Sequence, residues 1–366
     1  MKYIISGGGT GGHIFPAIAI GKAIERLDPE SEILFVGAEK RMEMEKVPAA
    51  GFEIVGLPVA GFNRKNPFKN IKVVYKLYKS LQKAKKIIKD FKPDVAIGVG
   101  GYASGPILKE AQKRGIPTLI QEQNSYAGVT NKLLAKKADK ICVAYDGMEK
   151  FFPAEKITNT GNPLRPSIIE AKKIDKKEAK KKLGFKTDTP LVVCVGGSLG
   201  ALSINEAMKK SLDGLKESGV NLLWQTGKRY HADYDIYNYE DKNTKISVVP
   251  FLEDMGNVYA AADIVVSRAG ASTISELQFL GKPSILIPSP NVAEDHQRKN
   301  AESLSQINAA VMIPDAEASE SLPKILKELI KDSRKLTDIS ENVLKMSKTG
   351  ADENIARMAI DLAGSK

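Results

Sequence analysis

Residues 3–13 read YIISGGGTGGH, and residues 191–201 read LVVCVGGSLGA. In each stretch a short apolar run passes into glycines, and a segment with helical periodicity follows. A strand that leads into a helix through a glycine-rich turn is the repeating unit of parallel sheets with helical crossovers. Because this unit begins both halves of the chain, the sequence predicts an α/β fold with two doubly wound parallel-sheet domains.

Strand-sized apolar runs alternate with helix-length segments along all 366 residues, a length that suits two domains. The first domain is predicted at residues 1–163, with a helix at about 350–366 packing back on it, and the second at 164–349. We expect a linker at 162–182 and a cleft between the domains. Strands are predicted at residues 3–6, 33–37, 53–57, 95–99, 117–121, 140–144, 191–195, 221–225, 246–250, 264–267 and 284–288, and helices at 16–27, 201–217, 272–280 and 351–363.

A basic segment from Phe62 to Lys92 contains eleven lysines and arginines and one acid, Asp90, so it holds nearly all of the net charge of +11. The lysines favour an anionic membrane surface as partner. No nucleic-acid partner is expected, because the chain contains no recognised nucleic-acid module. A crossover helix that covers a sheet would also explain the apolar residues of the segment, which recur at mostly helical spacing: Ile71, Val74, Tyr75, Tyr78, Leu81, Ile88 and Phe91.

The cysteines and the apolar runs bear on the compartment. Cys142 and Cys194 lie inside apolar runs, which predicts buried, reduced thiols. The longest apolar runs are strand-sized, well below the roughly 20 residues of a membrane helix. The apolar run at the N-terminus is too short for a signal peptide. We therefore expect a cytoplasmic protein.

Four glycine-containing turns lie where strands meet helices, at residues 7–13, 98–105, 196–201 and 268–276. Helix N-termini at such turns present free N–H groups and a positive dipole end, which suits phosphate. Two turns in each half predict a diphosphate ligand on each domain.

A dinucleotide site is the alternative for the first turn, because Gly7, Gly9 and Gly12 fit the pattern G-x-G-x-x-G. That site requires an acid at the end of the second strand. The strand ends at Ala38, and Glu39 falls one turn late.

Two residues suggest chemistry at these turns. His13 directly follows two glycines, and an imidazole there can act as a base near neutral pH. Glu276, about one turn into a predicted helix, could accept protons from ribose hydroxyls. The plain alternatives are a hydrogen-bonding histidine and an acid favoured by the helix dipole.

Two further segments contain histidines. Residues 293–301 read AEDHQRKNA, where Asp295, His296 and Gln297 could bond sugar hydroxyls or simply begin a helix. His231 lies beside Asp233 and Asp235, but this D-x-D does not follow a strand, so a surface loop is expected.

The motifs GGGTGGH, GGYASGP, QEQNSYAGVTNK, TGNPLR, GGSLGA and SRAGASTISE follow one another in this order. Together they resemble the MurG family of bacterial N-acetylglucosaminyltransferases, within glycosyltransferase family 28, from Gly7 to about Ala301. The resemblance implies a GT-B fold, which consists of two Rossmann-like domains facing across a cleft.

The resemblance also implies an activity. The expected reaction is inverting transfer of N-acetylglucosamine from UDP-N-acetylglucosamine to the C4 hydroxyl of the muramyl sugar in undecaprenyl-diphosphate-linked muramyl-pentapeptide. This step serves peptidoglycan synthesis, and so cell-wall biogenesis, cell shape and division, at the cytoplasmic side of the cell membrane. No metal or other cofactor is implied, because helix N-terminal N–H groups can stabilise the departing diphosphate.

Site residues carry over from the family position by position. His13 matches the proposed base, Leu252 the apolar position beside uracil, and Glu276 the ribose contact. The other implied substrate contacts are Thr10, Gly11, Gly12, Asn124, Arg165, Ser198, Ala271, Ser272, Thr273, Ile274, Ser275 and Gln297.

Three other hypotheses stay open on the sequence. They are a related GT-B enzyme that glycosylates a different membrane lipid, a nicotinamide-dependent oxidoreductase that uses residues 7–12, and a non-catalytic protein that binds UDP-sugars or anionic lipids.

Overall fold

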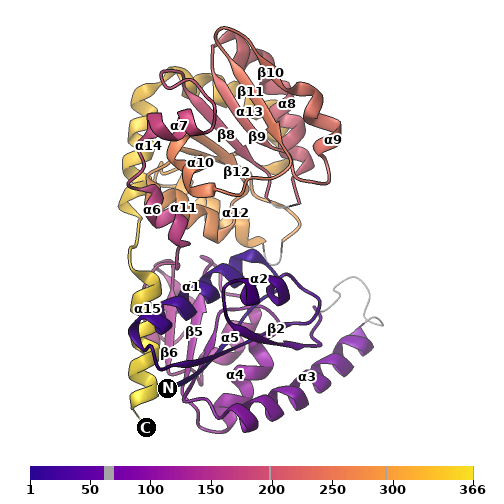
Figure 1. Ribbon diagram of the computed structural model, residues 1–366, viewed down its shortest axis with the longest axis vertical. Helices are drawn as coiled ribbons and strands as arrows, with labels where there is room; N and C mark the ends of the chain where they lie inside the picture. The colour runs from indigo at the N-terminus through magenta and orange to yellow at the C-terminus, as the bar shows by residue number, and fades with distance from the viewer. Residues whose placement is uncertain (62–69, 198, 293–294, 366) are drawn as a thin grey trace. The chain divides into compact units, whose positions relative to one another are not determined.

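The computed structural model describes residues 1–61, 70–197, 199–292 and 295–365. The chain divides into two compact units: unit 1 comprises Met1–Arg165 and Lys348–Lys366, and unit 2 comprises Pro166–Ser347. Each unit contains a seven-stranded sheet with helices packed on it, as Figure 1 shows. The predicted α/β fold class is confirmed.

The sheet of unit 1 has the order β3-β2-β1-β4-β5-β6-β7, and every pairing is parallel. All six strands predicted for this half are present, with ends that differ by at most one residue. The seventh, β7, has three residues and was not predicted. The strands are β1 (Lys2–Ser6), β2 (Glu32–Ala38), β3 (Glu53–Leu57), β4 (Val95–Gly98), β5 (Thr118–Glu122), β6 (Lys140–Val143) and β7 (Ile157–Asn159).

Successive residues of β1 point to opposite faces of the sheet, as strand geometry requires. Tyr3 and Ile5 join a core cluster with α1 (Gly11–Leu27) and α15 (Ala351–Gly364), whereas Ile4 joins a cluster with α3 (Asn70–Phe91) and α4 (Ser104–Lys113). All three side chains are fully buried. Burial on both faces explains why the strands are continuous apolar runs. Unit 1 also contains α2 (Glu43–Ala49), α5 (Val129–Ala135), and the short 3-10 helices η2 (Met148–Lys150) and η3 (Ala154–Lys156).

The helix predicted at residues 16–27 begins earlier than expected. The Thr10 carbonyl oxygen accepts hydrogen bonds from the N–H groups of His13 and Ile14, at 3.1 and 3.2 Å. These bonds close the first turn of α1 at Gly11, so Pro16 lies inside the helix. His13 therefore belongs to the first turn rather than to the loop that precedes it.

The sheet of unit 2 has the order β10-β11-β9-β8-β12-β13-β14, with one antiparallel pairing, β10 with β11. The five strands predicted for this half are present. Two strands, β10 and β14, were not predicted, because two residues are too few for a periodic pattern. The strands are β8 (Leu191–Val195), β9 (Asn221–Gln225), β10 (Tyr239–Glu240), β11 (Lys245–Val249), β12 (Ile264–Ser267), β13 (Ser284–Leu286) and β14 (Val311–Met312).

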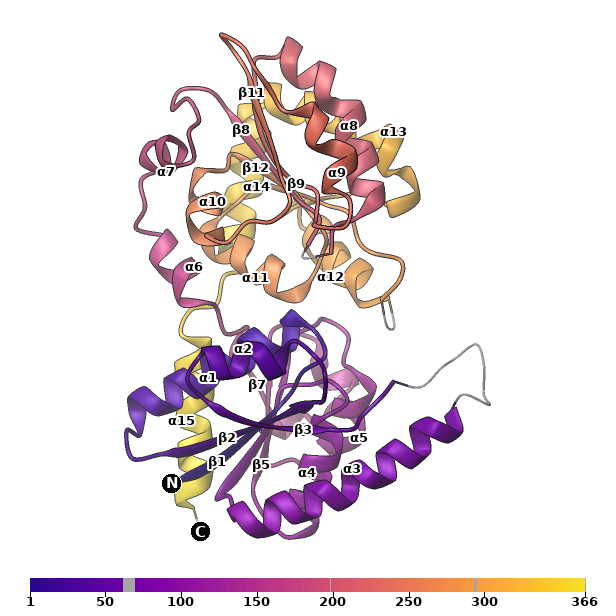
Figure 2. The same ribbon diagram turned by 45° about the vertical axis from the view of Figure 1, so that its right-hand side comes forward.

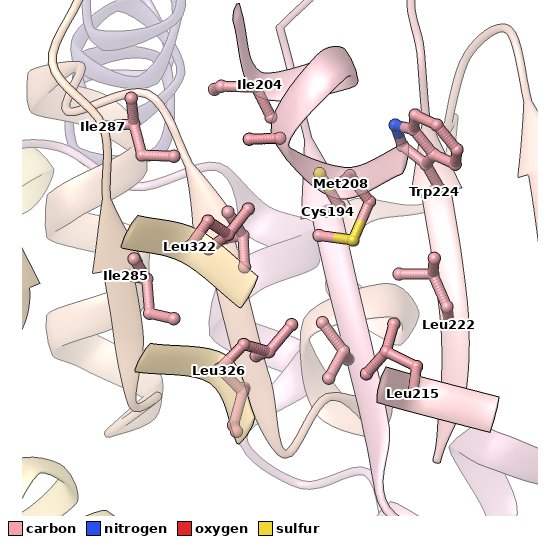
Figure 3. Packing of buried hydrophobic residues seen from close by; sticks show 14 of the residues in the cluster. Cys194, Ile204, Met208, Leu215, Leu222, Trp224, Ile285, Ile287, Leu322 and Leu326 are labelled. Atoms are coloured by element: carbon pink, nitrogen blue, oxygen red, sulfur yellow. The ribbon is translucent and has the colours of Figure 1, made fainter. Parts of the chain in front are cut away.

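The core of unit 2 includes an aromatic and aliphatic cluster on one sheet face, shown in Figure 3. Cys194 and Trp224 from neighbouring strands belong to this cluster together with Met208 of α8 (Leu202–Glu217) and Leu326 of α13 (Ala318–Lys331). Trp224 also donates its indole N–H to Asn205 Oδ1 at 3.1 Å, so its one polar group is satisfied. The other helices of unit 2 include α10 (Met255–Ala261), α11 (Ala271–Leu280), α12 (His296–Ser305), α14 (Ser333–Lys345) and η6 (Asp315–Glu317).

Two local predictions for this half were wrong. The linker predicted at residues 162–182 contains two helices, α6 (Pro166–Ala171) and α7 (Lys176–Lys182), which pack on α10 inside unit 2. Ile168 and Ala179 are buried there, so apolar burial outweighs the lysine-rich composition. The surface loop predicted around His231 is instead helical, with α9 (His231–Tyr234) followed by η4 (Asp235–Tyr237).

Both cysteine thiols are reduced and buried, as predicted. Burial raises the pKa of the Cys142 thiol to about 12 and also raises that of Cys194. Among the residues placed by the structure, no helix is long and apolar enough to cross a membrane.

Candidate active site

The glycine-rich loop of unit 1 lies at the carboxyl end of β1, beside the carboxyl end of β4. Gly8 and Gly9 have φ angles of 153° and 90°. Thr10 is exposed, and Gly11, Gly12 and His13 are half-buried in the first turn of α1. The predicted substrate contacts Thr10, Gly11 and Gly12 are therefore accessible, and their N–H groups lie at the positive end of a helix.

The ring of His13 is oriented by the loop itself. Its Nδ1 lies 3.1 Å from the carbonyl oxygen of Gly8 and 3.2 Å from Thr10 Oγ1. A carbonyl oxygen can only accept, so Nδ1 bears the proton in the neutral ring. Nε2 then holds the lone pair that a general base needs.

The second glycine turn of unit 1 packs directly on the first. A Cβ atom on Gly100 would lie 2.9 Å from His13 Nε2, and one on Gly101 would lie 2.3 Å from the Gly8 carbonyl oxygen. Both residues also have φ angles near 85°, which L side chains rarely adopt. These glycines allow two backbone segments and an imidazole to come together.

Asn124 follows β5, the next strand along this edge. Its N–H and its side-chain Nδ2 both donate to Glu122 Oε1, at 3.1 and 3.2 Å. The other carboxylate oxygen of Glu122 accepts from the N–H of Gly128 at 3.0 Å and from Asn131 Nδ2 at 2.9 Å. Glu122 is 2% exposed and thus organises the whole QEQN loop from within.

A buried amide network connects this loop to its neighbours. Gln123 Nε2 donates to the carbonyl of Val99 at 2.9 Å, and Asn162 Nδ2 donates to the carbonyl of Gln123 at 3.0 Å. Arg165, three residues beyond Asn162, holds its guanidinium 5.5 Å from the ring centre of Phe15 in α1. Unit 1 therefore gathers residues from the ends of several strands around His13.

In unit 2 the glycine turn after β8 is held by a buried glutamine. Gln225, 2% exposed, donates from Nε2 to the carbonyls of Gly197 at 2.8 Å and Pro250 at 3.3 Å. Ser198, the predicted diphosphate contact, lies outside the described residues. Leu252 is half-buried in the loop after β11, which Pro250 begins.

The fourth glycine turn leads from β12 into α11, whose N-cap is Gly270. The first N–H groups of a helix have no partner within it, so Ala271, Ser272 and Thr273 can present theirs to an anion. Ser275 is half-buried in the second turn, and Glu276, also in the second turn, is 4% exposed. Ile274 differs from the others, because its side chain is fully buried and its N–H donates to the Gly270 carbonyl at 3.0 Å.

Arg268, at the end of β12, has a structural function that the sequence did not reveal. It donates from Nη1 to the carbonyls of Ile287 and Pro288, at 3.1 and 3.2 Å, and forms an ion pair with Asp315. Its Nη2 donates to Ser203 Oγ at 3.0 Å. The arginine therefore joins three neighbouring segments at the edge where the glycine turns lie.

Gln297 lies in the first turn of α12, and its Oε1 accepts from the N–H of Ser289 at 2.9 Å. Asp295 precedes the helix with a positive φ of 55° and pairs with Arg298, and its side chain forms no cap bond within the described residues. The carboxyl ends of β11, β8, β12 and β13 thus bring the predicted residues of unit 2 to one edge.

Polar residues near the ends of apolar strands are the signal that was missed. Glu122, Gln123 and Gln225 all end strands or follow them directly, and all are buried. Within the residues that the structure places, no group of three or more histidine, cysteine or acidic side chains could hold a metal ion.

Comparisons with known proteins identify the family. The N-terminal domain model of glycosyltransferase family 28 matches residues 3–143, and the C-terminal domain model matches residues 191–355. A protein of Phocaeicola vulgatus is 55% identical over 364 residues, which cover 99% of this chain and 96% of that protein. Its name is UDP-N-acetylglucosamine–N-acetylmuramyl-(pentapeptide) pyrophosphoryl-undecaprenol N-acetylglucosamine transferase.

The chain belongs to glycosyltransferase family 28. A Bacteroides fragilis protein of the same name is 52% identical, with 99% of this chain and 96% of that protein covered. The crystal structure of Acinetobacter baumannii MurG superimposes with a TM-score of 0.79 at 27% identity, and covers 98% of this chain and 99% of that chain. The two units are the Rossmann-like domains of the GT-B fold, and the protein is a UDP-sugar glycosyltransferase rather than an oxidoreductase.

The packing of the two glycine turns in unit 1 is testable by Gly101→Ala. The added methyl group would meet the Gly8 carbonyl at 2.3 Å, at a residue with a φ of 81°. We expect the free energy of unfolding, measured by urea denaturation, to fall by about 1–3 kcal/mol. Gly105→Ala is the matched control, because its Cβ would meet only Thr130 Cγ2 at an ordinary 3.4 Å. Equal stability of the two variants would contradict the close approach.

Proposed function

We propose that this glycosyltransferase transfers N-acetylglucosamine from UDP-N-acetylglucosamine to the C4 hydroxyl of the muramyl sugar in undecaprenyl-diphosphate-linked muramyl-pentapeptide. The observation that supports this most strongly is identity of 52–55% to transferases of that name over nearly their whole length. The reaction is a single displacement with inversion at the anomeric carbon.

Unit 2 binds the donor in this proposal. The N–H groups of Ala271, Ser272 and Thr273 and the loop around Ser198 hold the diphosphate, because helix N-termini favour anions. Leu252 packs beside the uracil, and Gln297 binds sugar hydroxyls. Glu276 accepts hydrogen bonds from the ribose hydroxyls, with Ser275 beside it on α11. We leave Ile274 out of the contacts, because its side chain and its N–H are both engaged within the unit.

Unit 1 binds the acceptor and supplies the base. His13 Nε2 takes the proton of the acceptor hydroxyl. The hydroxyl oxygen attacks the anomeric carbon of the donor sugar, and the bond between that carbon and the UDP oxygen breaks. The negative charge that develops on the departing diphosphate is stabilised by helix N-terminal N–H groups. Thr10, Gly11 and Gly12 contact the acceptor diphosphate and the donor sugar, Asn124 contacts the donor sugar, and Arg165 lies at the connection between the units.

The first turns of α3 supply a surface for the lipid end of the acceptor. Val74, Tyr75 and Tyr78 are 57%, 58% and 59% exposed, although these residues were expected to cover the sheet. Ile88, from the same predicted stripe, does pack on the sheet, together with Ala84. In both views this end of α3 extends away from the rest of unit 1 (Figures 1 and 2).

Exposed lysines surround these apolar side chains, and Lys79 Nζ lies 4.7 Å from the ring centre of Tyr75. Exposed aromatic residues among lysines are typical of helices that lie on anionic membranes. Residues 62–69, the start of the predicted basic segment, lie outside the described residues. We propose that the protein is peripheral, on the cytoplasmic side of the cell membrane.

The activity is tested by incubating the protein with UDP-N-acetylglucosamine and a short-chain lipid-linked muramyl-peptide. We expect UDP release that depends on the acceptor, together with a product that contains one additional N-acetylglucosamine. A diacylglycerol acceptor is the control, because a related enzyme that glycosylates a different membrane lipid would use it. Release of UDP with diacylglycerol and not with the muramyl-peptide would overturn the proposed acceptor.

The base is tested by His13→Ala. We expect turnover to fall about 10²–10⁴-fold, the usual contribution of a general base, with donor affinity nearly unchanged. His231→Ala is the control, because this histidine lies in α9 of unit 2, contacts Thr226 Oγ1 at 3.4 Å and has no assigned part in the proposed reaction. If turnover of His13→Ala stays within a few-fold of the unmodified protein, His13 is not the base.

Membrane binding is tested by changing Lys72, Lys76, Lys79 and Lys83 to glutamine. Each lysine near an anionic surface contributes about 1 kcal/mol, so affinity for anionic vesicles should fall by at least tenfold. Activity on a soluble acceptor analogue should be retained. Sedimentation with vesicles measures the binding.

The matched control changes four exposed lysines of unit 2 to glutamine, which alters the net charge by the same amount. These are Lys173, Lys177, Lys181 and Lys182. We expect it to bind vesicles almost as well as the unmodified protein. Equal losses in both variants would show that net charge, and not the α3 surface, determines binding.

A further inference from the structure

Glu43, the first residue of α2, is a fully buried acid beside the glycine-rich loop of unit 1. Its Oε1 accepts hydrogen bonds from the N–H of Gly9 at 3.0 Å and from the N–H of Ala38 at 2.9 Å. One carboxylate oxygen therefore joins the loop after β1 to the end of β2. The proposed reaction assigns no role to Glu43, so it does not explain why a carboxylate is buried at this position.

The loop is shaped around this side chain. A Cβ atom on Gly8 would lie 2.2 Å from Glu43 Oε1, and one on Gly37 would lie 2.6 Å from Glu43 Cγ. Gly8, in the loop after β1, and Gly37, in β2, thus leave the space that the acid occupies. A side chain at either position would collide with Glu43, so both glycines are needed for the acid to fit here.

The N–H of Gly9 and the carbonyl of Gly8 belong to the same peptide group. Glu43 accepts from the N–H end of that group, and the carbonyl end accepts from His13 Nδ1 at 3.1 Å. A peptide group is planar, so holding one end determines the direction of the other. Hydrogen bonds in such a chain also polarise and strengthen one another.

We propose that Glu43 is a positioning residue for His13, acting through the Gly8–Gly9 peptide. The carboxylate fixes the carbonyl that keeps the proton on Nδ1, leaves the lone pair on Nε2, and stabilises the ring when Nε2 takes up a proton. The arrangement corresponds to the acid behind the histidine in a catalytic triad, with a peptide group interposed. The inference rests on the proposed role of His13.

The test uses selective ¹⁵N labelling of histidine, since the chain has three histidines and their ring nitrogens can be assigned by substitution. We expect the unmodified protein, without substrate, to show a protonated Nδ1 and an unprotonated Nε2 for His13. Glu43→Leu should lose this preference and show exchange between the two tautomers. Turnover should fall about 10²-fold, as for a misplaced catalytic group, with donor KM unchanged.

Glu43→Gln is the conservative variant, because its amide oxygen can still accept from both N–H groups. We expect it to keep the Nδ1–H tautomer and to recover most of the turnover. If the leucine variant does not fold, Glu43→Asp replaces it, because its carboxylate is withdrawn by one methylene and should also lose the tautomer preference.

Asp94→Leu is the matched structural control. Asp94 Oδ2 accepts from the N–H of Lys2 at 2.8 Å, at the opposite edge of the same sheet. This variant should be less stable but should keep the tautomer and the turnover. Loss of turnover in Glu43→Leu without a change of tautomer would overturn the proposal, because Glu43 would then be merely structural.

The experiments distinguish a wrong role for Glu43 from a wrong assignment of His13 as the base. If His13→Ala retains turnover, the base assignment fails. The nitrogen spectra need no substrate and still decide whether Glu43 positions the ring.

Discussion

The peptide group between Gly8 and Gly9 is the point on which the site of unit 1 depends. Its carbonyl accepts from His13, its N–H donates to Glu43, and Gly101 packs against its oxygen. Glu43 and Gly101, both distant in sequence, thus converge with the nearby His13 on one planar group. Because each contact constrains the same atoms, a change at any of them is transmitted to the imidazole.

In unit 2, side chains rather than a peptide group hold the loops at the ends of the strands. Gln225 and Arg268 are anchored to backbone carbonyls at the ends of neighbouring strands. Each of these side chains donates to at least two carbonyls, so each one holds separate segments of the chain together. The glycine turns of unit 2 can then present helix N–H groups to a diphosphate without a bound metal.

The α3 helix shows how one segment serves two purposes. Ala84 and Ile88 bury its later turns on the sheet, whereas Tyr75 and Tyr78 leave its first turns largely exposed. If the apolar residues of α3 only covered the sheet, they would be buried along the whole helix. The division allows a single helix to contribute both to the domain core and to the membrane-binding surface that we propose.

The sequence by itself determined the two parallel sheets and the glycine turns at their carboxyl edges, because strand, glycine turn and helix are local and periodic signals. The ordered motifs indicated the family by resemblance. The sequence also placed His13, which lies within one of those turns. It could not distinguish Glu43 from Glu45, yet only the first is buried. It also missed Gln225 and Arg268, and it did not show that Val74, Tyr75 and Tyr78 of α3 stay exposed. These features depend on hydrogen bonds and packing between residues far apart in the chain, and only the tertiary structure brings such residues together.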